Sequence, residues 1–206
     1  MTAPRSFAGS VFELVAIVAV ALGLAVVVQA FVVKPYRIPS GSMLPTLRVG
    51  QRILVDRMGL GVWSPKIGDV VVFHPPADYA ACADPDQGQP SGGLDGEQPC
   101  DVTQRRDSST TFVKRLVGLP GDHLQIRDGH VIRNGAPERD SYIVPCGEDS
   151  DCNFPGTIVV PRGDYYMMGD NRPDSDDSRF WGPVRRNWII GEAFFTYWPL
   201  DRVGLL

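Results

Sequence analysis

A long apolar run near the amino terminus is the feature that most constrains this chain. It extends from Val11 to Val33 as VFELVAIVAVALGLAVVVQAFVV, and its only polar side chains are Glu13 and Gln29. As a helix, a run of this length can cross a hydrocarbon core of roughly 30 Å. A core helix at a protein surface would carry a polar stripe, which this run lacks. We therefore predict a short cytoplasmic tail over residues 1–10 and a single transmembrane anchor over residues 11–33.

A cleavable secretory signal is the alternative interpretation of this run. Val28-Gln29-Ala30 places small residues at the two positions that such a cleavage site needs. The run is longer than the apolar core of about 7 to 15 residues that is typical of such signals, which favours a retained anchor. Both interpretations place residues 34–206 on the extracytoplasmic side of the cell membrane.

The cysteines agree with an oxidising compartment. All four follow the apolar run, and no pair has the CxxC spacing that is typical of a zinc site. Disulfides are therefore favoured over free thiols or a metal. Spacing alone suggests the pairs Cys82 with Cys100 and Cys146 with Cys152.

Composition and patterning predict a mainly β fold. With 22 glycines and 18 prolines, the chain is rich in turn-forming residues, and after the anchor no segment keeps a helical apolar period. Asp128-Gly129 favours a tight hairpin turn inside a predicted β-subdomain at about 123–160. The stretch at about 77–109 has few large apolar residues and is predicted to be a flexible loop. The predicted strands are residues 52–55, 69–73, 111–119, 123–135, 157–160, 165–170 and 192–198.

Net charge limits the partners that the chain could bind, and the scarcity of histidine limits the groups that could act as a base. A net charge of −4 offers no basic surface for nucleic acid, so we exclude nucleic acid as a partner. Serines 40 and 42 flank a glycine in IPSGSMLPTL, but none of the three histidines lies in a segment that suggests a base. A neutral lysine is the other group that can activate a serine. Of three lysines, only Lys114 lies in an apolar strand, where burial would lower its pKa.

Three motifs in this order after a membrane span resemble bacterial type I signal peptidase. They are SGSMLPTL, FVKRLVGLPGD and GDNRPDSDDSRFWGPV. The resemblance covers the anchor and most of the chain from Tyr36 to Asp122 and from Tyr165 to Trp198. It implies a membrane-bound serine protease with a Ser/Lys dyad, built as an antiparallel β-sheet catalytic domain with an inserted β-subdomain. Its substrates would be secretory preproteins whose signal peptides end in a small-x-small pattern.

The resemblance also implies site residues. Ser42 would be the nucleophile and Lys114 its general base, while the Ser40 hydroxyl and the Ser42 amide would form the oxyanion hole. Ser175 would contact the lysine amine beside an ion pair of Asp177 with Arg179. The substrate pockets would be lined by Ile38, Pro39, Met43 and Val113.

Two features of the third motif bear on metal binding and on the geometry of its turn. Its acidic residues could suggest calcium, but the pattern lacks the glycine and terminal glutamate of an EF-hand, and we expect no metal and no cofactor. Pro173 stands where many relatives carry an acid, so the turn could be built differently, although the spacing of Ser175, Asp177 and Arg179 is kept.

Two other functions share some of these features. A self-cleaving repressor-type Ser/Lys protease would need a DNA-binding module, which this chain lacks. A catalytically silent, membrane-anchored scaffold would be expected to have lost at least one of the residues Ser42, Lys114, Ser175, Asp177 and Arg179. We therefore predict an enzyme that contacts membrane lipid and acts as a monomer.

Overall fold

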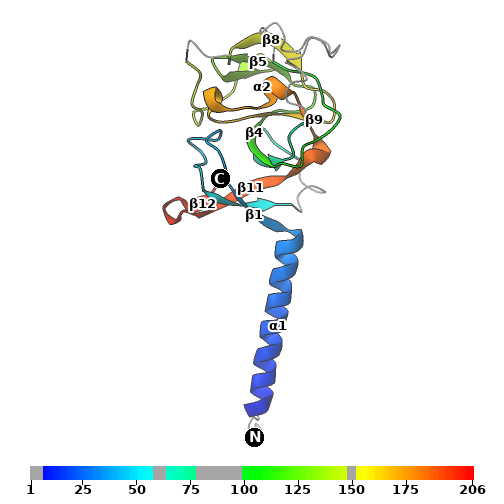
Figure 1. The fold of residues 1–206 in the computed structure, drawn as a ribbon, viewed down its shortest axis with the longest axis vertical. Helices are drawn as coiled ribbons and strands as arrows, with labels where there is room; N and C mark the ends of the chain where they lie inside the picture. The colour runs from blue at the N-terminus through cyan, green and yellow to red at the C-terminus, as the bar shows by residue number, and fades with distance from the viewer. Residues whose placement is uncertain (1–6, 58–63, 78–98, 148–151) are drawn as a thin grey trace.

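The computed structural model describes residues 7–57, 64–77, 99–147 and 152–206. Its architecture is mainly β, as the sequence predicts, with one long helix, α1 (Phe7–Phe31), that projects from the β-rich body (Figure 1). The helix ends before Lys34-Pro35, because a residue that precedes proline is disfavoured in helical conformation. Val33 already pairs with Asp56 in a strand, so the chain leaves the helix slightly before the predicted end of the anchor.

We found no helix among the described residues that is long and apolar enough to cross a membrane. The transmembrane anchor over residues 11–33 therefore stays a prediction.

The main sheet carries the predicted base Lys114 on β4, and the turn between its strands β1 and β2 carries Ser42. It has eight strands in the order β1-β2-β11-β3-β4-β9-β10, with β12 paired to β11, and all of its pairs are antiparallel. The strands are β1 (Val33–Arg37), β2 (Arg52–Asp56), β3 (Val70–Phe73), β4 (Phe112–Gly118), β9 (Asp164–Met168), β10 (Val184–Arg185), β11 (Ile189–Trp198) and β12 (Gly204–Leu205).

A second, four-stranded sheet occupies the stretch between β4 and β9. Its order is β7-β6-β5-β8, and it comprises β5 (His123–Arg127), β6 (His130–Arg133), β7 (Ala136–Pro137) and β8 (Phe154–Val159). Asp128 and Gly129 both have positive φ angles, of 51° and 80°, which is the conformation of the predicted two-residue hairpin turn. Figure 1 shows this sheet at the end of the body that is far from α1.

Strand β4 connects the parts of the core. Successive side chains of a strand point to opposite faces. Accordingly, Val117 packs with the second sheet, and Leu116 packs in a cluster that includes Trp181 of the short helix α2 (Ser178–Trp181). A third cluster joins Ile38, Met43 and Leu47 to the main sheet. The segment that carries Ser42 is therefore anchored in the core on both of its sides.

Candidate active site

Ser42 lies in a turn between β1 and β2 that is closed by its own backbone. Leu44 N–H donates to the Gly41 carbonyl at 3.0 Å, and Leu47 N–H donates to the Met43 carbonyl at 2.8 Å. Burial of Met43 in the core holds this turn in place, and Ser42 itself is only 8% exposed. The Ser40 and Ser42 hydroxyl oxygens are 3.4 Å apart. Two hydroxyls are thus presented together at one end of the sheet.

Lys114 lies in β4 between two neighbouring strands and is 3% exposed. Burial lowers the pKa of its amine, and the nearby carboxylates of Asp177 and Asp176 oppose that shift only in part. The amine lies 5.7 Å from the centre of the Phe112 ring. A lysine with a lowered pKa is closer to the neutral form, which is the form that can accept a proton.

Ser42 and Lys114 line the same pocket, which has a volume of about 900 Å³. The pocket therefore brings together a hydroxyl from the β1–β2 turn and an amine from β4. All of the residues predicted for the oxyanion hole and the substrate pockets also line it. They are Ile38, Pro39, Ser40, Met43 and Val113.

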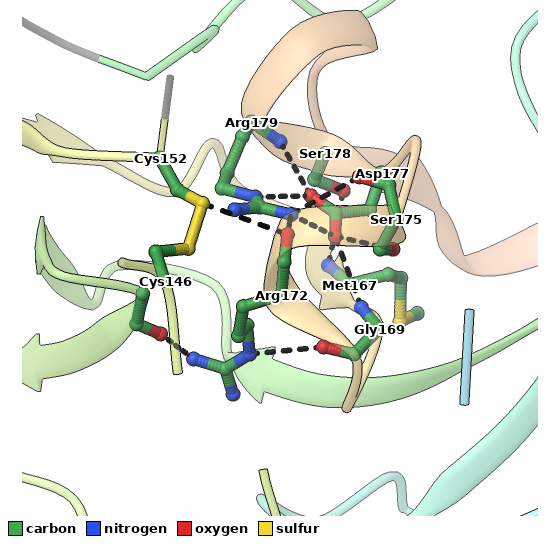
Figure 2. A network of polar contacts seen from close by, with 10 residues as sticks. Cys146, Cys152, Met167, Gly169, Arg172, Ser175, Asp177, Ser178 and Arg179 are labelled. Carbon is green, nitrogen blue, oxygen red and sulfur yellow. Dashed lines mark hydrogen bonds and ion pairs between the residues drawn. A yellow bond between two sulfur atoms is a disulfide. The ribbon is translucent and has the colours of Figure 1, made fainter. Parts of the chain in front are cut away.

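The segment after β9 forms the opposite side of this pocket. Ser175 donates its hydroxyl proton to Asp177 Oδ2 at 2.7 Å, and Arg179 Nε donates to Asp177 Oδ1 at 2.8 Å (Figure 2). Burial raises the pKa of Asp177, but the charge and hydrogen bonds of Arg179 outweigh it, so the net shift is downward. Asp177 also caps helix α2 through the Arg179 N–H. The ion pair that the resemblance implies is therefore present in the structure.

The predicted contact of Ser175 with the lysine amine stays a prediction. Ser175 lines the same pocket as Lys114. Its hydroxyl, however, is directed to Asp177, which is itself a close charged neighbour of the amine. Asp177 thus accepts a hydrogen bond from Ser175 and interacts electrostatically with the Lys114 amine.

One predicted disulfide is formed and lies beside the pocket. Cys146 is bonded to Cys152, and Cys152 lines the pocket. Its sulfur lies 3.7 Å from the carbonyl oxygen of Arg172, in the same network (Figure 2). Cys100 is also disulfide-bonded, but Cys82 lies outside the described residues, so that second pairing stays a prediction.

Sequence reasoning missed a charged group that joins the two halves of the site. Arg115, next to Lys114, donates to both carboxylate oxygens of Asp170, at 2.7 Å and 2.6 Å. Thr46 donates its hydroxyl proton to the same carboxylate at 2.5 Å. Asp170 therefore connects the turn that carries Ser42 to the strand that carries Lys114. The signal in the sequence was an arginine in FVKRLVGLPGD and an aspartate in GDNRPDSDDSRFWGPV, both within the recognised motifs.

A close backbone approach was also missed. A β-carbon at Gly169 would lie 2.4 Å from the carbonyl oxygen of Ser42 and 2.2 Å from the hydroxyl of Ser175. Only glycine leaves room for these groups to meet. Gly169 thus sets how closely the Ser175 segment packs against the Ser42 turn.

The histidines do not contribute to this pocket. His74, His123 and His130 are all outside its lining, and His130 is paired with Asp140 at 2.9 Å. In the described ranges, no group of three or more His, Cys, Asp or Glu side chains could hold a metal ion. The chemistry that this arrangement supports is nucleophilic attack by a serine that a lysine activates.

Known proteins are similar in sequence to this chain over most of its length. A family model described as signal peptidase, peptidase S26, matches residues 11–198. Probable signal peptidase I-1 from a Synechocystis species is 36% identical, over 94% of this chain and 86% of that relative. Signal peptidase I from Leptolyngbya laminosa is 35% identical, over 90% of this chain and 80% of that relative. Among solved structures, a signal peptidase I from Enterococcus faecalis is 25% identical over 63% of this chain and 96% of that chain, with a TM-score of 0.42.

Proposed function

The chain belongs to the signal peptidase family, peptidase S26, and we propose that it removes signal peptides from preproteins with Ser42 as nucleophile and Lys114 as general base. One observation supports this assignment of the dyad above all others. Two buried residues from distant segments, a serine and a lysine with a lowered pKa, line a single pocket. A buried lysine with a lowered pKa is costly to a fold, and activated nucleophiles are where such costs are found.

The reaction follows from these positions. The neutral Lys114 amine takes the proton of Ser42 as the serine oxygen attacks the scissile carbonyl, whose π electrons move to its oxygen. The Ser40 hydroxyl and the Ser42 N–H stabilise that oxyanion, and each such donor contributes about 2.7 to 4 kcal/mol. When the C–N bond breaks, the lysine ammonium gives its proton to the departing amine. Water, deprotonated by the same amine, then releases the signal peptide from the acyl-enzyme.

The pocket lining supports selection of small side chains. Ile38 and Met43 are buried, and Val113 packs against their cluster, so the apolar wall is fixed by the core. An extended peptide beside this wall would present alternate side chains to it, and large ones would overlap with it. We assign Ile38, Pro39, Met43 and Val113 to the recognition of the small-x-small pattern.

The membrane position of the enzyme is part of the proposal. The apolar sequence of residues 11–33 supports a single-pass anchor, and the Cys146–Cys152 disulfide supports an oxidising, extracytoplasmic location for the body. The C-terminal hairpin, which is formed by β11, β12 and the residues between them, lies at the end of the body from which α1 emerges (Figure 1). In it, Leu200 and Leu205 are 76% and 83% exposed. Of the aromatic residues of β11, Trp198 is exposed, and Phe194, Phe195 and Tyr197 are half-buried.

These exposed apolar groups support contact of the hairpin with the lipid interface. Such contact would bring the pocket to substrates that are themselves held in the membrane. We expect a single copy of the chain to be sufficient for this reaction.

The reaction is tested by incubating the full chain in detergent with a purified preprotein whose signal peptide ends in Ala-x-Ala. Mass spectrometry of the product should show a new amino terminus directly after the second alanine. A matched preprotein with Phe-x-Phe at these positions should not be cut. Cleavage elsewhere, or equal cleavage of both preproteins, would rule out the proposed specificity.

A further inference from the structure

The carbonyl of the peptide group between Gly41 and Ser42 accepts two hydrogen bonds, one from Leu44 N–H within the turn and one from Asn171 outside it. The Asn171 side-chain amide donates to the Gly41 carbonyl oxygen at 3.1 Å. The Asn171 backbone N–H donates to the next carbonyl along the chain, that of Ser42, at 3.0 Å. Asn171 therefore donates hydrogen bonds to two successive carbonyls of the turn that carries the nucleophile.

The orientation of a carbonyl fixes the orientation of the amide that is bonded to it. In a planar trans peptide group, the C=O and the N–H point in opposite directions. The cis peptide bonds in the described part of the chain are Leu44-Pro45 and Trp198-Pro199, so the bond between Gly41 and Ser42 is trans. With its carbonyl directed at Asn171, this peptide group directs the Ser42 N–H away from Asn171.

That amide is available to a substrate. The Ser42 N–H meets no hydrogen-bond acceptor among the described residues, although Ser42 is almost completely buried. Ser42 lines the pocket in which the scissile carbonyl would lie. A buried backbone N–H normally has a partner, and the oxyanion of the reaction would be one.

We propose that Asn171 is a positioning residue for the oxyanion hole, because it orients the Gly41–Ser42 peptide group so that the Ser42 N–H faces the reacting carbonyl. This inference rests on the proposed role of Ser42 as the nucleophile. Asn171 itself does not touch the substrate. Its side-chain amide also lies 3.4 Å from Asp174 Oδ2, which fixes its orientation with the nitrogen toward Gly41.

A purely structural role for Asn171 would have a different effect on ligand binding. If Asn171 only stabilised the loop, its loss would affect every ligand of the pocket alike. If it positions the oxyanion hole, its loss would weaken only those ligands that develop an oxyanion. The two roles can therefore be separated by a pair of inhibitors.

The experiment compares a substrate-like peptide aldehyde with the matched peptide alcohol, both ending in a small-x-small sequence, on the full chain in detergent. The Ser42 oxygen adds to the aldehyde carbon, the π electrons move to the aldehyde oxygen, and the Lys114 amine accepts the serine proton, which gives a hemiacetal oxyanion. The alcohol binds in the same pocket but cannot form this adduct. The ratio of the two dissociation constants thus reports on formation of the adduct, whose oxyanion the oxyanion hole stabilises.

Asn171→Ala should weaken binding of the aldehyde by about 10-fold to 100-fold and leave binding of the alcohol within about twofold, because the donor is misdirected and not removed. Asn171→Asp should show the same selective loss, because an ionised carboxylate cannot donate to the Gly41 carbonyl. Both variants keep the backbone N–H that contacts Ser42, which supports folding of the turn. Asn187→Ala, at an exposed asparagine outside the pocket lining, should change neither constant.

Equal weakening of both inhibitors in the two Asn171 variants would overturn the proposal in favour of a structural role, and so would no change in either inhibitor. Failure of the proposed function has a different signature. In that case the wild-type chain would bind aldehyde and alcohol equally well, and Ser42→Ala would leave the ratio unchanged.

Discussion

Lys114 combines two properties at the scale of a single residue that rarely occur together, a titratable amine and nearly complete burial. In water the amine would be protonated at neutral pH. Burial in β4 disfavours that charge, while Asp177, Asp176 and Asp174 favour it. The pKa of Lys114 is thus set by a balance that single substitutions can shift in either direction.

Loss of the carboxylate of Asp176 should shift that balance toward the neutral amine. Asp176 is exposed and lines the pocket, and its charge raises the pKa of Lys114. In Asp176→Asn the pKa of Lys114 should therefore fall further, and the acidic limb of kcat/KM should move to lower pH. The measurement is the pH profile of peptide cleavage. Asp201→Asn, at an exposed site outside the pocket, should leave the limb in place, and a shift to higher pH in Asp176→Asn would contradict this account.

Replacement of Lys114 by methionine should stabilise the protein while removing its activity. Because the pKa of Lys114 is lower in the folded state than in the unfolded state, the unfolded chain binds more protons between the two pKa values, and stability rises with pH through that window. Lys114→Met removes this cost, and we expect a gain of about 1 to 2 kcal/mol at neutral pH. Thermal unfolding of wild type and variant at several pH values tests this. A less stable variant would show that the amine is a net structural support.

At the scale of elements, the site depends on three segments that meet at their backbones. The Ser42 turn, strand β4 and the segment after β9 are joined by Asp170, which binds both Arg115 and Thr46. Their approach is closest at Gly169. The separation of Ser42 from Lys114 is therefore a property of how these segments pack.

Gly169→Ala should disrupt this packing. The new methyl group would overlap with the Ser42 carbonyl oxygen, which is backbone and cannot rotate away. We expect a loss of stability of about 1 to 3 kcal/mol together with a large fall in kcat. Gly204→Ala is the matched control, since a β-carbon there has no atom within 4 Å. A Gly169→Ala variant with wild-type stability and kcat would show that the segments can separate without consequence.

The elements that the sequence predicted are those with local signals. The strand at Phe112–Gly118 follows from its apolar run, and the hairpin at Asp128-Gly129 follows from its turn residues. Strand β1 was missed because Val33–Arg37 is polar and half-exposed and is defined by pairing with a distant strand. Helix α2 has only four residues, too few for an apolar period.

The candidate site was also predictable only where its residues have a local signal in the sequence. Its residue types and order were recognisable in the motifs, so Ser42 and Lys114 could be proposed from sequence. Other contacts of the site arise only from long-range packing. They are the link from Thr46 through Asp170 to Arg115 and the hydrogen bond from Asn171 to the Ser42 turn. A single sequence carries no local signal for such contacts.

At the scale of the whole molecule, one end of the body gathers α1 and the C-terminal hairpin (Figure 1), and Leu200 and Leu205 of that hairpin are exposed. Arg202 of that hairpin donates to the carbonyl oxygen of Thr46 at 3.0 Å, so the hairpin also contacts the segment that follows the nucleophile. We expect this end to face the lipid.

The double variant Leu200→Asp/Leu205→Asp should lower cleavage of a preprotein that is embedded in lipid vesicles. Cleavage of a soluble peptide in detergent should be unchanged, because both side chains are exposed and lie outside the pocket. The ratio of the two rates is the measurement. Val159→Asp, at an exposed apolar side chain on the second sheet, is the control. An unchanged ratio in the double variant would remove the hairpin from the membrane contact.

The dyad is tested most directly by preprotein cleavage with wild type, Ser42→Ala and Lys114→Arg, each shown by thermal unfolding to be folded. Arginine keeps the positive charge and approximate length of lysine but does not lose its proton in proteins, so it cannot act as a base. We predict that only the wild type cuts the preprotein after the small-x-small site. Cleavage by folded Lys114→Arg or Ser42→Ala at a rate near that of the wild type would contradict the assignment of these two residues.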